Sequence, residues 1–427
     1  MPDPVSGLRL ERTLGADWLF SGPRYRPAMG SIVPVFTPLA VSEHDAVAVL
    51  LHRSLAGWYE SKLGQGARFG DRPEPFRLIP EVYAALDPDE ALAARAPDTG
   101  QLLGVCFVHP RPTHVSLGIV AVAPEAQGLG VARGLLTRAL AEADARGVPT
   151  RLVSSLLNLD SFSLYTRHGF VPEEVYQDIV VPVPPDGLRL PPGLRAGTAE
   201  EQGPVGAGGG ARRVRAAKPT DAARITAYEH ARRGIARPTD HALFLANRVG
   251  DWRVWVAEDD RGTLTGYLVA SVHPHHRAIG PGAVDDEATA EALLLTALDS
   301  YRGGSVLVLA PAAAAGLVAL LYALGGRNVE LHVAQSRPVP VPMASSASGS
   351  EADSASAAVP AGPAAAPTAG TPATGSNDGT AEAWIRAHDP VRTADGAARA
   401  DASSGGEALP QIASRGFAFP TFLPESA

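Results

Sequence analysis

Hydrophobic and polar positions follow two different periods between residues 31 and 185. Stretches with apolar residues at helical spacing alternate with short stretches rich in Val, Leu and Ile, which are typical of strands. A glycine after the longest helical stretch and two prolines before residue 115 predict a helix end and a hairpin turn. The pattern predicts helices at 46–55, 131–146 and 161–168, extended chain at 76–86, strands at 102–108, 115–122 and 150–155, and the last strands within 170–183.

The same order of elements begins again after residue 212. A short strand leads into a capped helix start, and two apolar stretches flank the polar turn Asp259-Asp260-Arg261-Gly262. The pattern predicts a hairpin of strands at 252–258 and 264–272, helices at 288–298 and 312–324, and a strand at 305–309. We therefore expect two similar units in one chain.

Composition sets the limits of these units. Pro and Gly are frequent between residues 186 and 211, and Ala, Ser, Gly, Pro and Thr dominate from 344 to about 380, where a core cannot be buried. Residues 416–423 alternate and carry aromatic side chains, as a strand does. We expect an N-terminal extension at 1–30, a first domain at 31–185, a flexible linker at 186–211, a second domain at 212–343, a largely disordered insertion at 344–405, and a strand within 406–427 that returns to the second domain.

Charge and cysteine content narrow the class of protein. The net charge of −8 over 427 residues argues against a nucleic-acid partner. Cys106 is the single cysteine, so the chain forms no internal disulfide and fits a reducing compartment. Residues 1–20 carry charges throughout, and nowhere do 18 apolar residues run together. We expect a soluble cytoplasmic protein without a membrane partner.

The most informative stretch is 122–136, which is predicted to be the end of a strand, a turn and the start of a helix. Such a turn leaves backbone N–H groups unpaired, and Gly128 and Gly130 allow an anion to approach them closely. A turn that is merely tight is the alternative. No Lys-Ser/Thr pair follows, which excludes a Walker loop, and Arg133 stands where the dinucleotide-binding pattern needs glycine.

Gln127, Gly130 and Ala132 match the pattern Gln/Arg-x-x-Gly-x-Gly/Ala, and Asn158, Tyr165 and Gly169-Phe170 follow further along. The two segments resemble the acetyl-coenzyme A loop and the Asn…Tyr…Gly-Phe signature of the GNAT superfamily of N-acetyltransferases. The resemblance implies two GNAT-like units with an α/β (α+β) fold, each a mixed, mostly antiparallel sheet flanked by helices. It implies acetyl-CoA as co-substrate, no metal, and a cofactor site formed by Ala121, Val122, Gln127, Gly128, Leu129, Gly130, Val131, Ala132, Arg133 and Asn158.

The same resemblance suggests the catalytic groups. Tyr165 would protonate the leaving thiolate, because a phenol can act on a hydrogen-bonded sulfur of comparable pKa; the alternative is a core tyrosine. Asn158 would support the pantetheine arm, or else form a turn. A backbone N–H near Ala121 or Val122 would stabilise the oxyanion. Cys106 is most simply a small buried hydrophobe.

The general base is harder to assign. Many family members carry a glutamate where this chain has Ser116, and serine does not accept a proton at neutral pH. His114, two residues earlier and so on the same strand face, is the predicted base, with a structural histidine at the hairpin end as the alternative. The amine can also arrive neutral or lose its proton to water. By analogy Tyr59 and Glu60 line the acceptor site, unless they are an aromatic lid and a solvated carboxylate.

In the second unit the corresponding loop reads Gly280-Pro281-Gly282-Ala283-Val284-Asp285-Asp286-Glu287. Three carboxylates at a helix start suit the helix dipole but repel a pyrophosphate, so this unit is expected to be degenerate. The leading hypothesis is an N-acetyltransferase that moves an acetyl group to a small-molecule or peptide amine by direct attack in a ternary complex. A non-catalytic coenzyme A-binding sensor or scaffold is the rival, and transfer of a longer acyl chain stays open. The sequence sets no oligomeric state.

Overall fold

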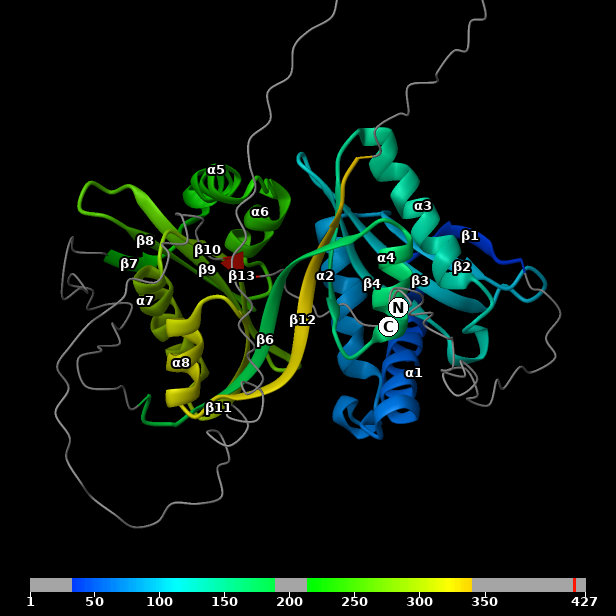
Figure 1. Ribbon diagram of the computed structural model, residues 1–427, viewed down its shortest axis with the longest axis horizontal. Helices are drawn as coiled ribbons and strands as arrows, with labels where there is room; N and C mark the ends of the chain where they lie inside the picture. The colour runs from blue at the N-terminus through cyan, green and yellow to red at the C-terminus, as the bar shows by residue number, and fades with distance from the viewer. Residues whose placement is uncertain (1–32, 189–212, 340–417, 420–427) are drawn as a thin grey trace, which may run out of the picture. The chain divides into compact units, whose positions relative to one another are not determined.

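The computed structural model describes residues 33–188 and 213–339, and the backbone of 418–419. Its strands form one mixed sheet in the order β1-β2-β3-β4-β5-β12-β6-β11-β10-β9-β8-β7, which is mostly antiparallel (Figure 1). Helices cover both faces, so the α/β class predicted from the sequence is confirmed. No helix in the described ranges is long and apolar enough to cross a bilayer.

The first half follows the predicted order of elements. Phe107 of the third strand stacks on Tyr83 of the second helix, whereas the Cβ position of Gly104 faces Val131 and Leu135 of the third helix. An odd separation along a strand places these contacts on opposite faces of the sheet. The elements are β1 (Val35–Pro38), α1 (His44–Leu63), α2 (Leu78–Leu86), β2 (Ala91–Arg95), β3 (Leu102–Pro110), β4 (Val115–Val122), α3 (Val131–Arg146), β5 (Thr150–Ser155), α4 (Leu159–Arg167) and β6 (Val171–Val183).

The second half repeats this order, with its own core around the strands β8 to β11. Its hairpin, helix and strand predictions are confirmed to within a few residues. Two residues of the predicted C-terminal strand form β13 (Ala418–Phe419), which pairs antiparallel with β10. The elements are β7 (Arg213–Ala216), α5 (Ala222–Arg233), α6 (Pro238–Ala246), β8 (Trp252–Glu258), β9 (Leu264–His273), β10 (His276–Val284), α7 (Glu287–Leu298), β11 (Gly304–Pro311), α8 (Ala315–Ala323) and β12 (Arg327–Arg337).

Two sequence predictions for the first half are wrong. Residues 76–86 are not extended: a short 3-10 turn leads into α2, whose buried residues Ile79, Tyr83 and Leu86 recur at helical spacing. Pro80 is tolerated because it lies in the first turn, where its missing N–H has no helical acceptor. The stretch 170–183 contains one long strand, β6, rather than several.

The two halves exchange their last strands. β12 of the second half lies between β5 and β6 and pairs antiparallel with both: His332 is opposite Ser155 of β5 on one side and Tyr176 of β6 on the other. β6 of the first half in turn pairs with β11 of the second. The halves therefore share one sheet, and each depends on the other for its last strand (Figure 1).

A bulge opens the sheet at the same place in each half. β4 and β5 are parallel partners only at Val115 and Ser116, after which β4 carries one residue more than β3 between Leu117 and Val120. Such an extra residue bends a strand, so β4 turns away from β5 and leaves a cleft edge. β10 repeats the arrangement: it pairs with β11 at two residues and then bulges against β9.

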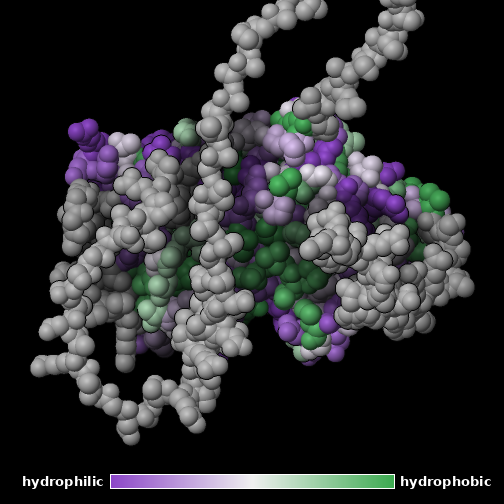
Figure 2. All heavy atoms as spheres, viewed as in Figure 1, coloured by the Kyte–Doolittle hydropathy of each residue, from purple (hydrophilic) through white to green (hydrophobic). Residues whose placement is uncertain are grey.

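β12 has an unusual distribution of polar and apolar side chains. Glu330 and His332 are buried on one face, while Val329 and Leu331 on the other face are 46% and 38% exposed. Val175 of the neighbouring β6 is exposed as well. In Figure 2 apolar side chains gather over the middle of the molecule, between the parts with more polar surface. Burying the polar face of a strand costs free energy unless its side chains find polar partners, so Glu330 and His332 need such partners.

Candidate functional site

The predicted anion site has the geometry of an open turn. Gly128 and Gly130 have φ of 76° and 83°, a conformation that favours glycine, and Gly130 is the N-cap of α3. A Cβ on Gly128 would meet no atom within 4 Å, so the surface beside it is open. Within the described ranges no protein acceptor pairs with the amides of Gly128 and Gly130, and the Gly130 C=O accepts the Gly134 N–H at 2.9 Å as a helix N-cap does. The turn can therefore receive an anion.

Unpaired groups also lie on β4, which leads into this turn, and at the start of α4. Beyond Ser116 the edge of β4 that faces β5 has no strand partner among the described residues. Asn158, three residues after the end of β5, is the N-cap of α4, and its Oδ1 accepts the Ser161 N–H at 3.0 Å. The Asn158 Nδ2 and the Ser161 Oγ are buried and bond to no described residue. Buried polar atoms without partners are costly, so these two groups fit a ligand that enters the cleft.

Tyr165 lies on α4 between this N-cap and the end of the helix. Its side chain is 3% exposed and its ring meets that of Phe170 edge-on at 5.8 Å. The ring of Tyr165 is thus packed within the core of the first half. The burial is compatible with both alternatives that the sequence leaves open, a general acid at the cleft and a core tyrosine.

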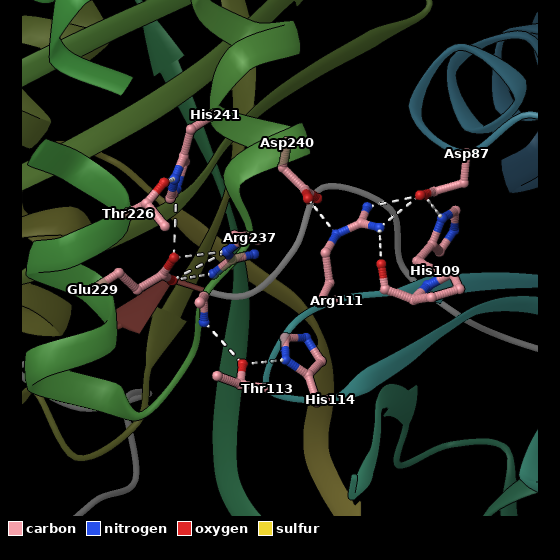
Figure 3. Close-up of polar contacts among 12 residues, drawn as sticks. Asp87, His109, Arg111, Thr113, His114, Thr226, Glu229, Arg237, Asp240 and His241 are labelled. Carbon is pink, nitrogen blue, oxygen red and sulfur yellow. Dashed lines mark hydrogen bonds and ion pairs between the residues drawn. The ribbon is translucent and has the colours of Figure 1, made fainter. Parts of the chain in front are cut away.

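His114 is buried in a polar network that joins the two halves (Figure 3). Its Nδ1 lies 3.0 Å from the Thr113 hydroxyl, which accepts the Ala236 N–H of the second half at 2.9 Å. Burial, and then the positive charges of Arg237 and Arg151, lower its pKa to about 3. A histidine in these surroundings stays neutral and is a weak base, which favours the structural alternative at the hairpin end.

Next to His114 a second buried ion pair crosses between the halves (Figure 3). The guanidinium of Arg111 donates to both Asp87 oxygens at 2.7 and 2.9 Å and, through Nε, to Asp240 of α6. Burial alone would raise the pKa of Asp87, but the hydrogen bonds from His109 and Arg111 lower it. Each nitrogen of the Arg111 guanidinium donates to a protein acceptor, so we interpret this network as the joint between the halves.

The acceptor residues predicted by analogy have different surroundings. Glu60 is exposed, and its carboxylate accepts the Gly66 N–H at 3.0 Å, which stabilises the loop after α1. Tyr59 is 2% exposed and donates its phenol to Glu330 of β12, a residue that the sequence did not single out. Cys106 is fully buried in the first core, as expected for a small hydrophobe.

The second half lacks an open turn at the corresponding place. β10 leads into α7 through Asp285 and Asp286 alone, and the Asp286 carboxylate caps the helix by accepting the Thr289 N–H at 2.8 Å. Past the bulge of β10, its edge is paired with β13 at Gly282 and Ala283. The helix start and the strand edge, which are open in the first half, are therefore both occupied by the chain itself in the second half.

Two family models match the chain. The model of the acetyltransferase (GNAT) family matches residues 55–170, and that of an acetyltransferase (GNAT) domain matches residues 234–337. No curated protein matches the chain.

Among solved structures, the chain is similar to a protein from Pyrococcus horikoshii assigned as an acetyltransferase, with 15% identity and a TM-score of 0.51 over 74% of this chain and 93% of that one. It is also similar to a GCN5-related N-acetyltransferase from Sphaerobacter thermophilus, with 16% identity and a TM-score of 0.48 over 72% and 96% of the two chains. A tandem GNAT protein from the clavulanic acid biosynthesis pathway matches at 18% identity and a TM-score of 0.47, over 72% and 99%.

The two family models together match just over half of the chain, and one model falls in each half of the shared sheet. The chain therefore belongs to the GNAT acetyltransferase family as a tandem member.

Proposed function

We propose that the first half is an acyl-CoA-dependent N-acetyltransferase site that acts on an amine, with the second half as its support. The observation that carries the proposal is the open turn at Gly128 and Gly130 beside the unpaired edge of β4. An anion at a helix start and an extended arm along a strand edge together match the pyrophosphate and pantetheine of coenzyme A. Acetyl-CoA would supply the acyl group there as a thioester.

The residues of this chain have separate tasks in the proposal. The amides of Gly128, Gly130 and the first turn of α3 bind the pyrophosphate, whereas the N–H groups of Gln127 and Leu129 donate to Pro124 and Ala126 within the turn. The Asn158 amide holds the extended arm. A backbone N–H near Ala121 or Val122 stabilises negative charge on the carbonyl oxygen. Tyr165 holds a proton for the leaving sulfur, and its small exposed fraction keeps bulk water away from that proton.

The acceptor amine must be neutral when it attacks. His114 is a weak base in its buried position, so in this proposal the amine loses its proton to water or arrives uncharged. The attack forms a C–N bond and breaks the C–S bond. The nitrogen gives up one proton to water, the sulfur takes the proton held by Tyr165, and the phenolate then regains a proton from water.

Release of free thiol in the presence of acetyl-CoA and a panel of primary amines tests the activity. We expect thiol release that depends on both the amine and acetyl-CoA. Binding of acetyl-CoA without amine-dependent thiol release on any member of the panel would favour the sensor or scaffold.

A further inference from the structure

The buried polar face of β12 lies against the end of α1 in the first half. The Glu330 side chain is 4% exposed, and its Oε1 accepts hydrogen bonds from the phenol of Tyr59 and the hydroxyl of Ser155. Burial, and then the bond to Glu330, raise the pKa of Tyr59, so the phenol stays protonated and donates. Two groups of the first half thus fix a carboxylate of the second half in one orientation.

The other oxygen of Glu330 faces a cation. Arg68 Nη2 lies 2.8 Å from Oε2, and the Arg68 guanidinium carbon lies 5.0 Å from the centre of the Tyr59 ring and 5.6 Å from that of Phe69. The two rings meet edge-on at 4.9 Å. A carboxylate beside aromatic rings is a strong combination for binding a cation, because charge attraction and cation–π attraction act together.

Arg68 differs from the groups that surround it. Its side chain is 31% exposed, whereas Tyr59 and Glu330 are almost fully buried. It belongs to the short 3-10 turn Gly66–Phe69, which lies between Gly64 and Gly70 with φ of 66° and 72°. The carboxylate and the Tyr59 ring are therefore held by the sheet and α1, while the cation is supplied by a loop at the surface.

The position of this group relates it to the cleft. Ser155 is the last residue of β5, the strand from which β4 diverges. Trp58 of α1 donates its indole N–H to Asp160 of α4 at 3.3 Å, two residues after the Asn158 cap. Behind Glu330, on the same strand face, His332 bonds to Asp178 through Nδ1, and its buried Nε2 has no partner in the described ranges. The polar group thus borders the α1 side of the site proposed above.

From these contacts we infer that Tyr59, Phe69 and Glu330 form a cation box of the acceptor site, and that Arg68 occupies it when no acceptor is bound. The acceptor is then an amine that carries a second cationic group, an ammonium or guanidinium, which displaces Arg68. The acceptor role of the bound amine rests on the proposed function, but the box itself binds a cation whether or not acyl transfer occurs.

Calorimetry of the full-length protein without acetyl-CoA tests the box. The probes are 4-aminobutylguanidine, which is cationic at both ends, and 1-pentanol, which is uncharged. We expect tighter binding of 4-aminobutylguanidine to the wild type. Arg68→Ala removes the competing guanidinium and should tighten that binding, whereas Glu330→Gln should weaken it by about 10-fold or more, as is usual for loss of a charged hydrogen bond. Arg72→Ala, which removes an exposed ion pair with Glu74 in the same loop, is the matched control and should leave the affinity for both probes unchanged.

Phe69→Leu keeps the test informative if Glu330→Gln does not fold. Loss of this ring should weaken binding of 4-aminobutylguanidine by roughly threefold to tenfold and leave binding of uncharged 1-pentanol unchanged. Equal binding of the two probes to the wild type, or unchanged binding in Arg68→Ala, would overturn the inference. If the expected pattern holds but thiol release is absent with every amine, the box stands and the transferase proposal alone fails.

Discussion

An aspartate in place of Gly128 tests the open turn with little disturbance of the fold. Gly128 and Gly147 flank α3 at its two ends, with φ of 76° and 66°, and a Cβ at either position meets no atom within 4 Å. Aspartate tolerates this conformation better than most residues, and the backbone cost of either substitution is about 1 kcal/mol. Gly147→Asp is therefore a matched control for Gly128→Asp.

The two variants differ in their electrostatic effect. An aspartate near the N-terminus of a helix is favourable and one near the C-terminus is unfavourable, each by about 0.3–1 kcal/mol, so Gly128→Asp should be the more stable variant. Its carboxylate would stand close to a bound pyrophosphate. One pair of like charges about 5 Å apart at an effective dielectric of about 20 costs about 3 kcal/mol, which is more than 100-fold in Kd.

Calorimetric titration with acetyl-CoA and urea unfolding measure both quantities in the same samples. We expect Gly128→Asp to lose acetyl-CoA binding while its free energy of unfolding equals or exceeds that of Gly147→Asp. Gly147→Asp should bind acetyl-CoA like the wild type. Equal affinities for acetyl-CoA in the two variants would refute the assignment of the turn.

Three further predictions follow from the site and the shared sheet. Tyr165→Phe should lower turnover by about 100-fold or more and leave the Kd for acetyl-CoA nearly unchanged. Tyr322→Phe, at an exposed tyrosine of α8, should change neither turnover nor Kd. Unaltered turnover of Tyr165→Phe in steady-state assays would remove the general acid. Because the pKa of His114 is lowered from an ordinary value near 6.5 to about 3, the free energy of unfolding should fall as the pH falls below 6.5. Between pH 7.5 and pH 5 the wild type should lose about 2 kcal/mol more than His114→Gln in urea unfolding. Parallel plots of unfolding free energy against pH for the two proteins would contradict this. Residues 1–188 alone lack β12, so they should show no cooperative thermal transition until residues 213–427 are added, and a cooperative transition of the fragment alone would speak against the strand exchange.

Local signals predicted much of the fold. The bounds of α3 and β5 follow from the sequence because Gly147 ends the helix and Pro149 stands just before the next strand. Residues 76–86 were misassigned because Pro80 interrupts a short apolar stretch, and its place in a first helical turn is visible only once Tyr83 is seen packed on Phe107. Local patterns also gave the strand, turn and helix around Gly128, whose left-handed φ was expected of a glycine.

Long-range pairing set the limit of prediction. β12 is recognisable as a strand, but nothing in its own residues tells that it inserts between β5 and β6. For the same reason the sequence does not mark Glu330 as a site residue, because its partners Tyr59 and Ser155 lie far away along the chain. One signal in the sequence is that Glu330 and His332 alternate with the apolar residues Val329 and Leu331. The structure shows that the apolar face of this strand is the more exposed one.

The stoichiometry of acetyl-CoA binding to the full-length chain tests the central claim most directly. The open turn of the first half offers one site, whereas in the second half Asp286 caps the helix and β13 pairs with the strand edge. Calorimetric titration should therefore give one acetyl-CoA per chain, and none for Gly128→Asp. A stoichiometry of two, or no binding to the wild type, would contradict the account.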